Sequence, residues 1–158
     1  MNTQPWFTPE AIAQVQLILD NYCHWFKTEL ISRESSPEQQ AKNLFEAPFV
    51  VLSHDTAADP VYTYGNQTAL DLWERTWAEL LQMPSRQSAE SFNEAQTTRN
   101  QILRDSRALG FQAGFSGIRV RKSGQRIKIE DVKLWDLLDA AGEYRGQAAV
   151  FSKWTFLD

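Results

Sequence analysis

The chain of 158 residues is long enough for one compact domain and too short for two of ordinary size. Its 42% apolar and 23% charged residues are typical of a globular protein, and its net charge of −4 argues against a chain-wide basic surface for nucleic acid or anionic lipid. The single cysteine, Cys23, excludes an intrachain disulfide, and the longest aliphatic-aromatic run, Phe49 to Leu52, is too short to cross a bilayer. We therefore expect a cytoplasmic protein with no membrane segment and no direct nucleic-acid partner.

An amphipathic helix is predicted near the N-terminus, over residues 8–32. Thr8 is a suitable N-cap, Pro9 pre-sets the first turn, and Glu10 lies at the positive end of the helix dipole. Apolar residues then recur at helical spacing and form one stripe: Ile12, Val15, Leu19, Tyr22 and Phe26. Because such a stripe needs a partner surface, we expect this helix to pack on the domain's own sheet or in a homodimer.

The middle of the chain reads as short helices and strands separated by proline and asparagine signals. Ser36 and Pro37 start a helix, and Asn66 can cap another that carries Trp73. The elements expected here are a helix from Pro37 that ends before Pro48, strands over 49–53 and 61–64, helices after Asn66 and over 76–81, and a longer polar helix from Ser91 or Asn93 to Leu109.

The last third of the chain changes to the alternation of strands. Residues 116–121 and 126–130 alternate apolar and polar side chains and are joined by the turn signal Ser123-Gly124. The alternation changes phase before Val132, which indicates either a bulge near Glu130-Asp131 or a strand buried on both faces. A closing strand is expected over 144–156.

This order of elements predicts an α+β fold. Two strands, a run of helices and three hairpin-linked strands fit a five-stranded antiparallel sheet with helices on one face and an added N-terminal helix. That is a PAS-like layout. No repeat or linker interrupts the sequence, so residues 1–158 are expected to form a single domain.

Several separate motifs, in the right order, resemble the MEKHLA family in its stand-alone bacterial form. The matching segments are 60–67, 84–90, Gly110-Phe111, 114–117 and 146–154. The resemblance implies a PAS-like sensory or regulatory module rather than an enzyme. The family also forms the C-terminal domain of plant class III homeodomain-leucine zipper transcription factors, where it is regarded as restraining dimer formation.

The residue types present argue against two cofactors that PAS domains use. Covalent flavin chemistry needs a cysteine on a central helix, and no cysteine follows Cys23, which we expect to be an inert thiol. Haem ligation needs an axial histidine, and residues 91–109 contain none. His24 and His54 lack metal-ligand spacing and are expected at the surface or an interface. The cofactor is unknown. The interpretation that remains is that the domain binds a small organic ligand non-covalently.

The candidate ligand contacts are aromatic and polar side chains. Arg86 could clamp an anion or pair with Glu90, and Gln147 lies beside two alanines that leave space on the sheet. The candidate ligand-binding residues are Tyr64, Trp73, Arg86, Glu90, Phe111, Trp135 and Gln147. No catalytic or metal-binding residue is proposed.

The function expected from the sequence is a non-catalytic sensory module in which a bound ligand changes how the N-terminal helix packs. One alternative is a protein-interaction or dimerisation module without a small ligand, which predicts an exposed apolar patch. Another is a small α+β enzyme of the scytalone-dehydratase kind, which would need a buried His-Asp or His-Glu pair. His54 beside Asp55 is the local candidate for that pair.

Overall fold

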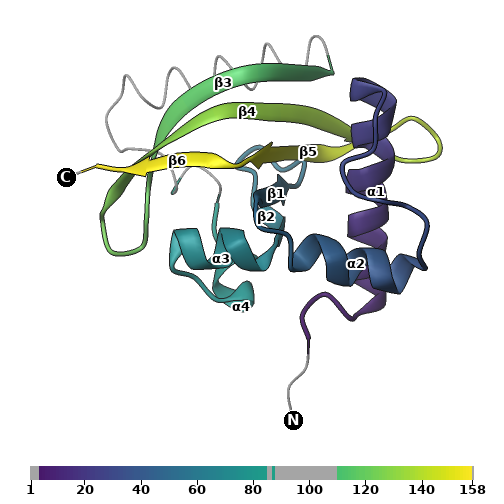
Figure 1. Cartoon of the computed structure of the whole chain (residues 1–158), viewed down its shortest axis with the longest axis horizontal. Coiled ribbons are helices and arrows are strands. Elements are labelled where there is room, and N and C mark those ends of the chain that lie inside the picture. Colours follow the sequence, from purple (N-terminus) through teal and green to yellow (C-terminus); the bar gives the residue numbers. More distant parts are fainter. Residues whose placement is uncertain (1–3, 85–86, 88–109, 158) are drawn as a thin grey trace.

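The computed structural model describes residues 4–84, 87 and 110–157 (Figure 1). Its elements are α1 (Pro9–Phe26), α2 (Pro37–Phe45), β1 (Val50–His54), β2 (Tyr62–Gly65), α3 (Gln67–Trp73), α4 (Trp77–Leu80), β3 (Phe111–Val120), β4 (Arg126–Leu138), β5 (Tyr144–Phe151) and β6 (Lys153–Phe156). The polar helix predicted between residues 91 and 109 lies outside the described residues, as do Arg86 and Glu90.

The N-terminal helix begins where its capping signals place it. The side chain of Thr8 accepts a hydrogen bond from the Ala11 N–H. The helix ends at Phe26, earlier than the predicted range 8–32, because Lys27 adopts a left-handed backbone (φ 61°) and donates its N–H to the Cys23 carbonyl. Ser36 caps α2 in the same manner, by accepting from the Gln39 N–H.

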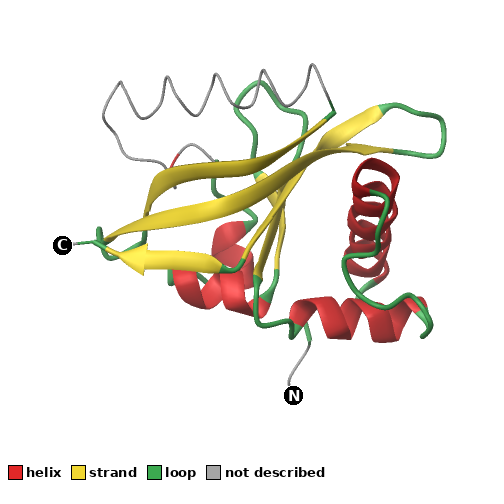
Figure 2. Ribbon diagram, turned by 45° about the horizontal axis from the view of Figure 1, so that its top comes forward, coloured by secondary structure: helices red, strands yellow, loops and turns green. Residues whose placement is uncertain are grey.

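The strands form one curved antiparallel sheet in the order β2-β1-β5-β4-β3 (Figure 2). The predicted closing strand over 144–156 is broken at Ser152, which gives six strand segments in place of five. The long β4 therefore has two neighbours on one side: β5 pairs with its second half and β6 pairs with its first half.

A bulge in β4 explains the phase change seen in the sequence. Phe115 pairs with Val132 and Gly117 pairs with Ile129, so β4 holds one more residue than β3 across this interval. Asp131 occupies the bulge with a left-handed backbone (φ 56°). As a result Ile129 and Val132 lie in one buried cluster on the same face, and the predicted bulge is confirmed.

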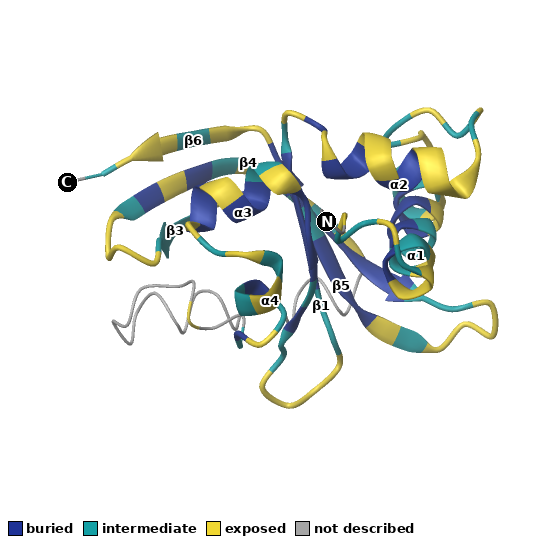
Figure 3. Cartoon of the chain, turned by 90° about the horizontal axis from the view of Figure 1, so that it is seen from below, coloured by how far each residue is buried: buried dark blue, intermediate teal, exposed yellow. Residues whose placement is uncertain are grey.

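Helices cover both faces of the sheet. Along β1, Val51 belongs to a cluster with α1 and α2, whereas Val50 and Leu52 belong to a cluster with α3. Figure 3 shows β1 and β5 passing between α1 and α2 on one side and α3 and α4 on the other. We call the face under α1 the outer face and the face under α3 the inner face.

Hydrogen bonds with the C-terminal end of β4 hold α1 on the outer face. Asn21 donates to the Leu138 carbonyl and accepts from the Leu138 N–H, both at 3.0 Å. The Trp135 indole donates to the Ile18 carbonyl (3.2 Å), and the Trp25 indole donates to the Asp136 carbonyl (2.9 Å). The Trp25 ring also fills the space where a side chain at Gly110 would lie, 2.3 Å from the ideal Cβ position.

On the inner face, Asn66 and a hairpin tip hold α3. The buried Asn66 side chain accepts from the N–H groups of Val51 and Ala69 and donates to the carbonyls of Leu44 and Phe49. At the other end of α3, the β3–β4 hairpin caps the helix, because the Arg121 guanidinium donates to the Leu72 carbonyl at 2.7 Å. Both ends of this short helix are thus satisfied by side chains.

Candidate functional site

A row of polar side chains crosses the inner face on three neighbouring strands. Gln147 of β5 pairs with His54 of β1 on one side and with Asp136 of β4 on the other. Their neighbours Ser53, Trp135 and Ala148 face α1, so alternation directs the three polar side chains inward. Adjacent strands lie ~4.8 Å apart, which spreads the row over roughly 10 Å.

Burial makes this row unusual. Gln147 is 2% exposed and Asp136 is 5% exposed, and both stand at the end of an otherwise apolar inner face. Buried amide and carboxylate groups are costly unless they form hydrogen bonds, so such residues are kept where a polar partner is available. The row therefore marks the polar end of this face.

The imidazole of His54 is held in one orientation by its own loop. Its Nδ1 lies 2.9 Å from the Asp55 carbonyl oxygen. Because a carbonyl only accepts, Nδ1 is the donor in this contact, and Nε2 is the ring nitrogen that remains. The row thus combines an imidazole, an amide and a carboxylate.

Small and apolar residues form the floor beside the polar row. Ala149 is the next inward residue of β5 and pairs with Leu52 and Leu134. The methyl group of Ala149 lies between two leucines, so the centre of the floor is lower than its sides.

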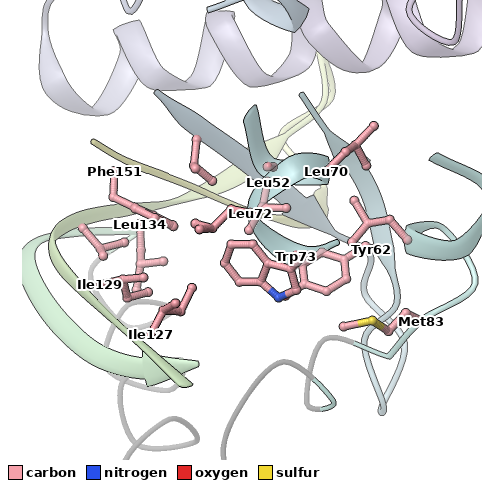
Figure 4. Close-up of a cluster of buried hydrophobic side chains, with 14 of the residues drawn as sticks. Leu52, Tyr62, Leu70, Leu72, Trp73, Met83, Ile127, Ile129, Leu134 and Phe151 are labelled. Carbon is pink, nitrogen blue, oxygen red and sulfur yellow. The ribbon is translucent and has the colours of Figure 1, made fainter. Parts of the chain in front are cut away.

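Apart from this row, two polar atoms on the inner side lack a partner within the part of the chain that the structure describes. The indole N–H of Trp73 is buried in the inner cluster, and the residue is 1% exposed. In Figure 4 the indole nitrogen points between Ile127 and Met83, away from Leu72. On the edge strand β3, the buried side-chain carbonyl oxygen of Gln112 also has no hydrogen bond. One donor and one acceptor are therefore available on this side of the sheet.

The structure does not bring the predicted site residues together. Trp73 and Gln147 belong to the inner side, whereas Tyr64 and Trp135 are fully buried in the cluster under α1. Phe111 pairs with Trp135 and stacks on Trp25, with the ring centroids 5.7 Å apart.

Tyr64 is an unsatisfied polar group on the outer side. Its hydroxyl has no hydrogen-bond partner among the described residues, and burial raises the pKa of the phenol above its ordinary value. The ring packs edge-on against Trp77, with centroids 5.7 Å apart. The phenol is therefore un-ionised at neutral pH.

Sequence reasoning missed Asp136 and placed His54 at the surface or an interface. The signal for Asp136 is its position inside the apolar run Leu134-Trp135-Asp136-Leu137, where a charged residue in a strand buried on both faces must point into the protein. His54 is half-buried at the end of β1. Nothing in the local sequence pairs it with Asp136, because β5 stands between their strands.

Metal chemistry and membrane insertion find no support in residues 4–84, 87 and 110–157. This part of the chain contains no group of three or more His, Cys, Asp or Glu side chains placed to hold a metal ion. It also contains no helix with the length and apolar character needed to cross a lipid bilayer.

The sheet order, the helices on both faces and the N-terminal helix define a PAS/LOV-like domain. Solved structures with this fold include the PAS domain of a protein from Colwellia psychrerythraea, with a TM-score of 0.61 and 12% identity over 76% of this chain and 95% of that one. The light-state dimer of the fungal blue-light photoreceptor Vivid gives a TM-score of 0.59 and 14% identity over 93% and 98%. Within this class, the chain belongs to the MEKHLA domain family, which it matches over residues 12–156.

Curated relatives of the chain are plant homeobox-leucine zipper proteins. It is 29% identical over 156 residues to HOX29 of Oryza sativa subsp. indica and 28% identical over 160 residues to REVOLUTA of Arabidopsis thaliana. The alignments cover 95% of this chain and 18% of each relative. The similarity is thus to one part of a much longer protein.

Proposed function

We propose that the chain is a non-catalytic sensory or regulatory module whose inner face binds a small organic ligand non-covalently. The observation that carries this proposal is the row of His54, Gln147 and Asp136, of which the last two are buried, beside the small side chain of Ala149. A flat heterocycle that carries both donors and acceptors suits this set, because each polar group of the row can serve one edge of the ring.

Signalling would pass through β4, because this strand directs side chains to both faces of the sheet. The Asp136 side chain faces inward, while its main-chain carbonyl accepts the Trp25 indole N–H of α1 at 2.9 Å. The next residue, Trp135, donates to the Ile18 carbonyl of the same helix. A ligand that moves β4 by a fraction of an ångström would weaken or strengthen these bonds, and thereby shift the population of docked helix.

Native mass spectrometry of the purified protein tests for a bound ligand, and thermal shift tests for binding of added probes. Riboflavin and flavin mononucleotide are suitable first probes, because a solved neighbour of this fold is a light-oxygen-voltage domain with a flavin analogue. Free nucleobases form the second set. We expect one class to raise Tm in the wild type and in Tyr64→Phe, which alters only the outer side, and to have no effect in Gln147→Leu. A shift of equal size in Gln147→Leu, or no bound or stabilising compound at all, would contradict the proposal.

A homodimer is the second candidate function. The observation in its favour is the edge strand β3, where Phe111 is 37% exposed and continues the aromatic surface of Trp25 and Phe26. The Vivid structure is itself a dimer. Light scattering across a concentration series would show a dimer that Phe111→Arg dissociates, and a monomer at all concentrations would exclude it.

The proposal also covers the cytoplasmic location and the stand-alone form of the family that the sequence motifs suggest. Expression of the gene product in its own cell, followed by fractionation and measurement of its intact mass, tests both points. A mass well above 18.2 kDa would contradict the stand-alone form.

A further inference from the structure

A pocket lies on the outer face, near the C-terminal end of α1. Its volume is about 230 Å³. Tyr22 of α1, Leu30 of the following segment, Phe49 and Val150 supply most of its apolar lining. β4 contributes a charged wall that consists of Asp131 and Lys133. None of the residues that line the pocket belongs to the row of His54, Gln147 and Asp136, so a proposal for this pocket does not rest on the function proposed above.

Lys133 presents unused hydrogen-bond donors to this pocket. Its ammonium group donates to the Tyr22 hydroxyl at 2.9 Å and lies 5.5 Å from the ring centroids of both Tyr22 and Phe26. The two rings hold the cation in place. An ammonium group has three N–H donors, and the Tyr22 hydroxyl is the one acceptor that the described residues offer it. Two donors therefore remain for an anionic group in the pocket.

Asp131 brings an unpaired carboxylate to the same wall. It is exposed, and within the described part of the chain its carboxylate forms neither an ion pair nor a hydrogen bond, although Lys133 is only two residues away. Its backbone is left-handed (φ 56°), a conformation that glycine or asparagine adopts more readily. The bulge thus places the Asp131 carboxylate near the Lys133 ammonium group, although the two groups form no ion pair.

We propose that this pocket binds a small zwitterion of the α-amino acid class. The ligand carboxylate accepts from Lys133, its ammonium group donates to Asp131, and its apolar side chain packs on Leu30, Phe49 and Val150. A simple carboxylate would be repelled by Asp131, and a simple amine would be repelled by Lys133. The volume is below the 300–1,000 Å³ of pockets for drug-sized ligands, which suits a molecule of amino-acid size.

An occupant of this pocket would bridge the N-terminal segment and the sheet. Tyr22 and Leu30 lie on one side of it, and Lys133 and Val150 lie on the other. Binding would therefore favour the docked position of the end of α1, because a ligand stabilises the state to which it binds.

The test compares L-leucine with two analogues that each lack one charged group. Isothermal titration and two-dimensional NMR on the full chain would use L-leucine, 4-methylpentanoate and isopentylamine. We expect L-leucine to bind at least tenfold more tightly than either analogue, with chemical shift changes at Tyr22, Leu30 and Val150. Equal affinity for the three probes, or no saturable binding of L-leucine, would overturn the proposal.

Two variants and one control locate the site. Lys133→Met keeps the apolar stem and removes the charge, and Asp131→Asn keeps a residue that tolerates the left-handed backbone. Each is expected to weaken L-leucine binding at least tenfold, whereas Lys128→Met, on an exposed part of β4, leaves it unchanged. Unchanged affinity in either site variant would overturn the assignment, and the analogue series gives its own result if Lys133→Met does not fold.

Discussion

The two faces of the sheet treat their polar groups differently. On the outer face, the indole groups of Trp25 and Trp135 and the amide of Asn21 all bond to main-chain atoms of the opposite layer. On the inner face, the Trp73 indole has no partner among the described residues. Tyr64 is the exception on the outer side, since its hydroxyl is also without a partner there.

The side chains that anchor the outer face find their hydrogen-bond partners within the described chain. On the inner face, one buried donor has no such partner. A buried donor without an acceptor costs about 1–3 kcal/mol. The outer face avoids that cost at three of its anchor points. The inner face carries it at Trp73, as far as the described residues show, and it also holds the polar row of His54, Gln147 and Asp136. The Trp73 indole without a described partner, together with this polar row at the end of an apolar face, is therefore the physical reason for placing the proposed ligand on the inner side.

The largest expected effect is at Gly146, where the backbones of β5 and β1 approach closely. A Cβ at this position would lie 2.0 Å from the His54 carbonyl oxygen, and the backbone has φ 137°. We expect Gly146→Ala to lower the free energy of unfolding by about 2–5 kcal/mol in urea denaturation, from overpacking and backbone strain together. Gly124→Ala is the matched control, because it has a positive φ of 91° but open space around it. Its expected cost is about 1–2 kcal/mol, and equal losses in the two variants would contradict the close approach.

The next effect concerns the attachment of α1. Asn21→Ala leaves the N–H and carbonyl of Leu138 without their partner, which is expected to cost about 2–3 kcal/mol. Hydrogen exchange of the Leu138 amide should accelerate more than that of β1 amides. Gln39→Ala, at an exposed position of α2, serves as the control and should change stability by less than about 0.5 kcal/mol. A similar change in both variants would show that the Asn21 clamp is unimportant.

A pair of indole substitutions compares the faces directly. Trp135→Phe and Trp73→Phe remove similar volumes from buried sites, but among the described residues only Trp135 loses a hydrogen bond, the one to the Ile18 carbonyl. We therefore expect Trp135→Phe to be more destabilising by about 1 kcal/mol. Chemical denaturation of both variants in the absence of ligand measures the difference. The opposite order would mean that the Trp73 indole already has a partner.

The smallest expected effect is a dependence of stability on pH that arises from Glu79 of α4. The Lys122 ammonium, which donates to the Glu79 carboxylate, and the Thr76 N–H hold the pKa of Glu79 at about 2. A depressed pKa in the folded state stabilises the fold above the unfolded value of about 4.5, and this stabilisation is lost as the pH falls towards 2. Glu79→Gln should therefore unfold at a slightly lower temperature than wild type at pH 6. The difference should disappear near pH 2, and a constant difference across this range would refute the assignment.

The sequence predicted the class of fold because its signals are local. Thr8, Ser36 and Asn66 cap helices as expected, and the phase change before Val132 located the β4 bulge. The break at Ser152 was not predicted, because no glycine or proline interrupts residues 150–156 and the break depends on which part of β4 each half pairs with.

The candidate site was only partly predictable. Gln147 was proposed from the two alanines that follow it in the sequence, whereas Asp136 and His54 become its neighbours through strand pairing across the sheet. Aromatic residue type likewise carries no information about which face a side chain occupies. Trp73 and Trp135 therefore seemed equivalent in the sequence and lie on opposite sides of the structure.

The contact between Trp25 and Gly110 constrains how this protein can change over time. The indole ring occupies the volume that any larger residue at 110 would require, and the backbone there has φ 87°. A larger residue at 110 clashes with the indole, and a smaller residue at 25 leaves a void. We therefore expect the residues at these two positions to covary, although they are far apart in the sequence. Across members of the family, we expect the glycine to be kept wherever the tryptophan is present, because a side chain at 110 would both clash with the indole and strain the backbone.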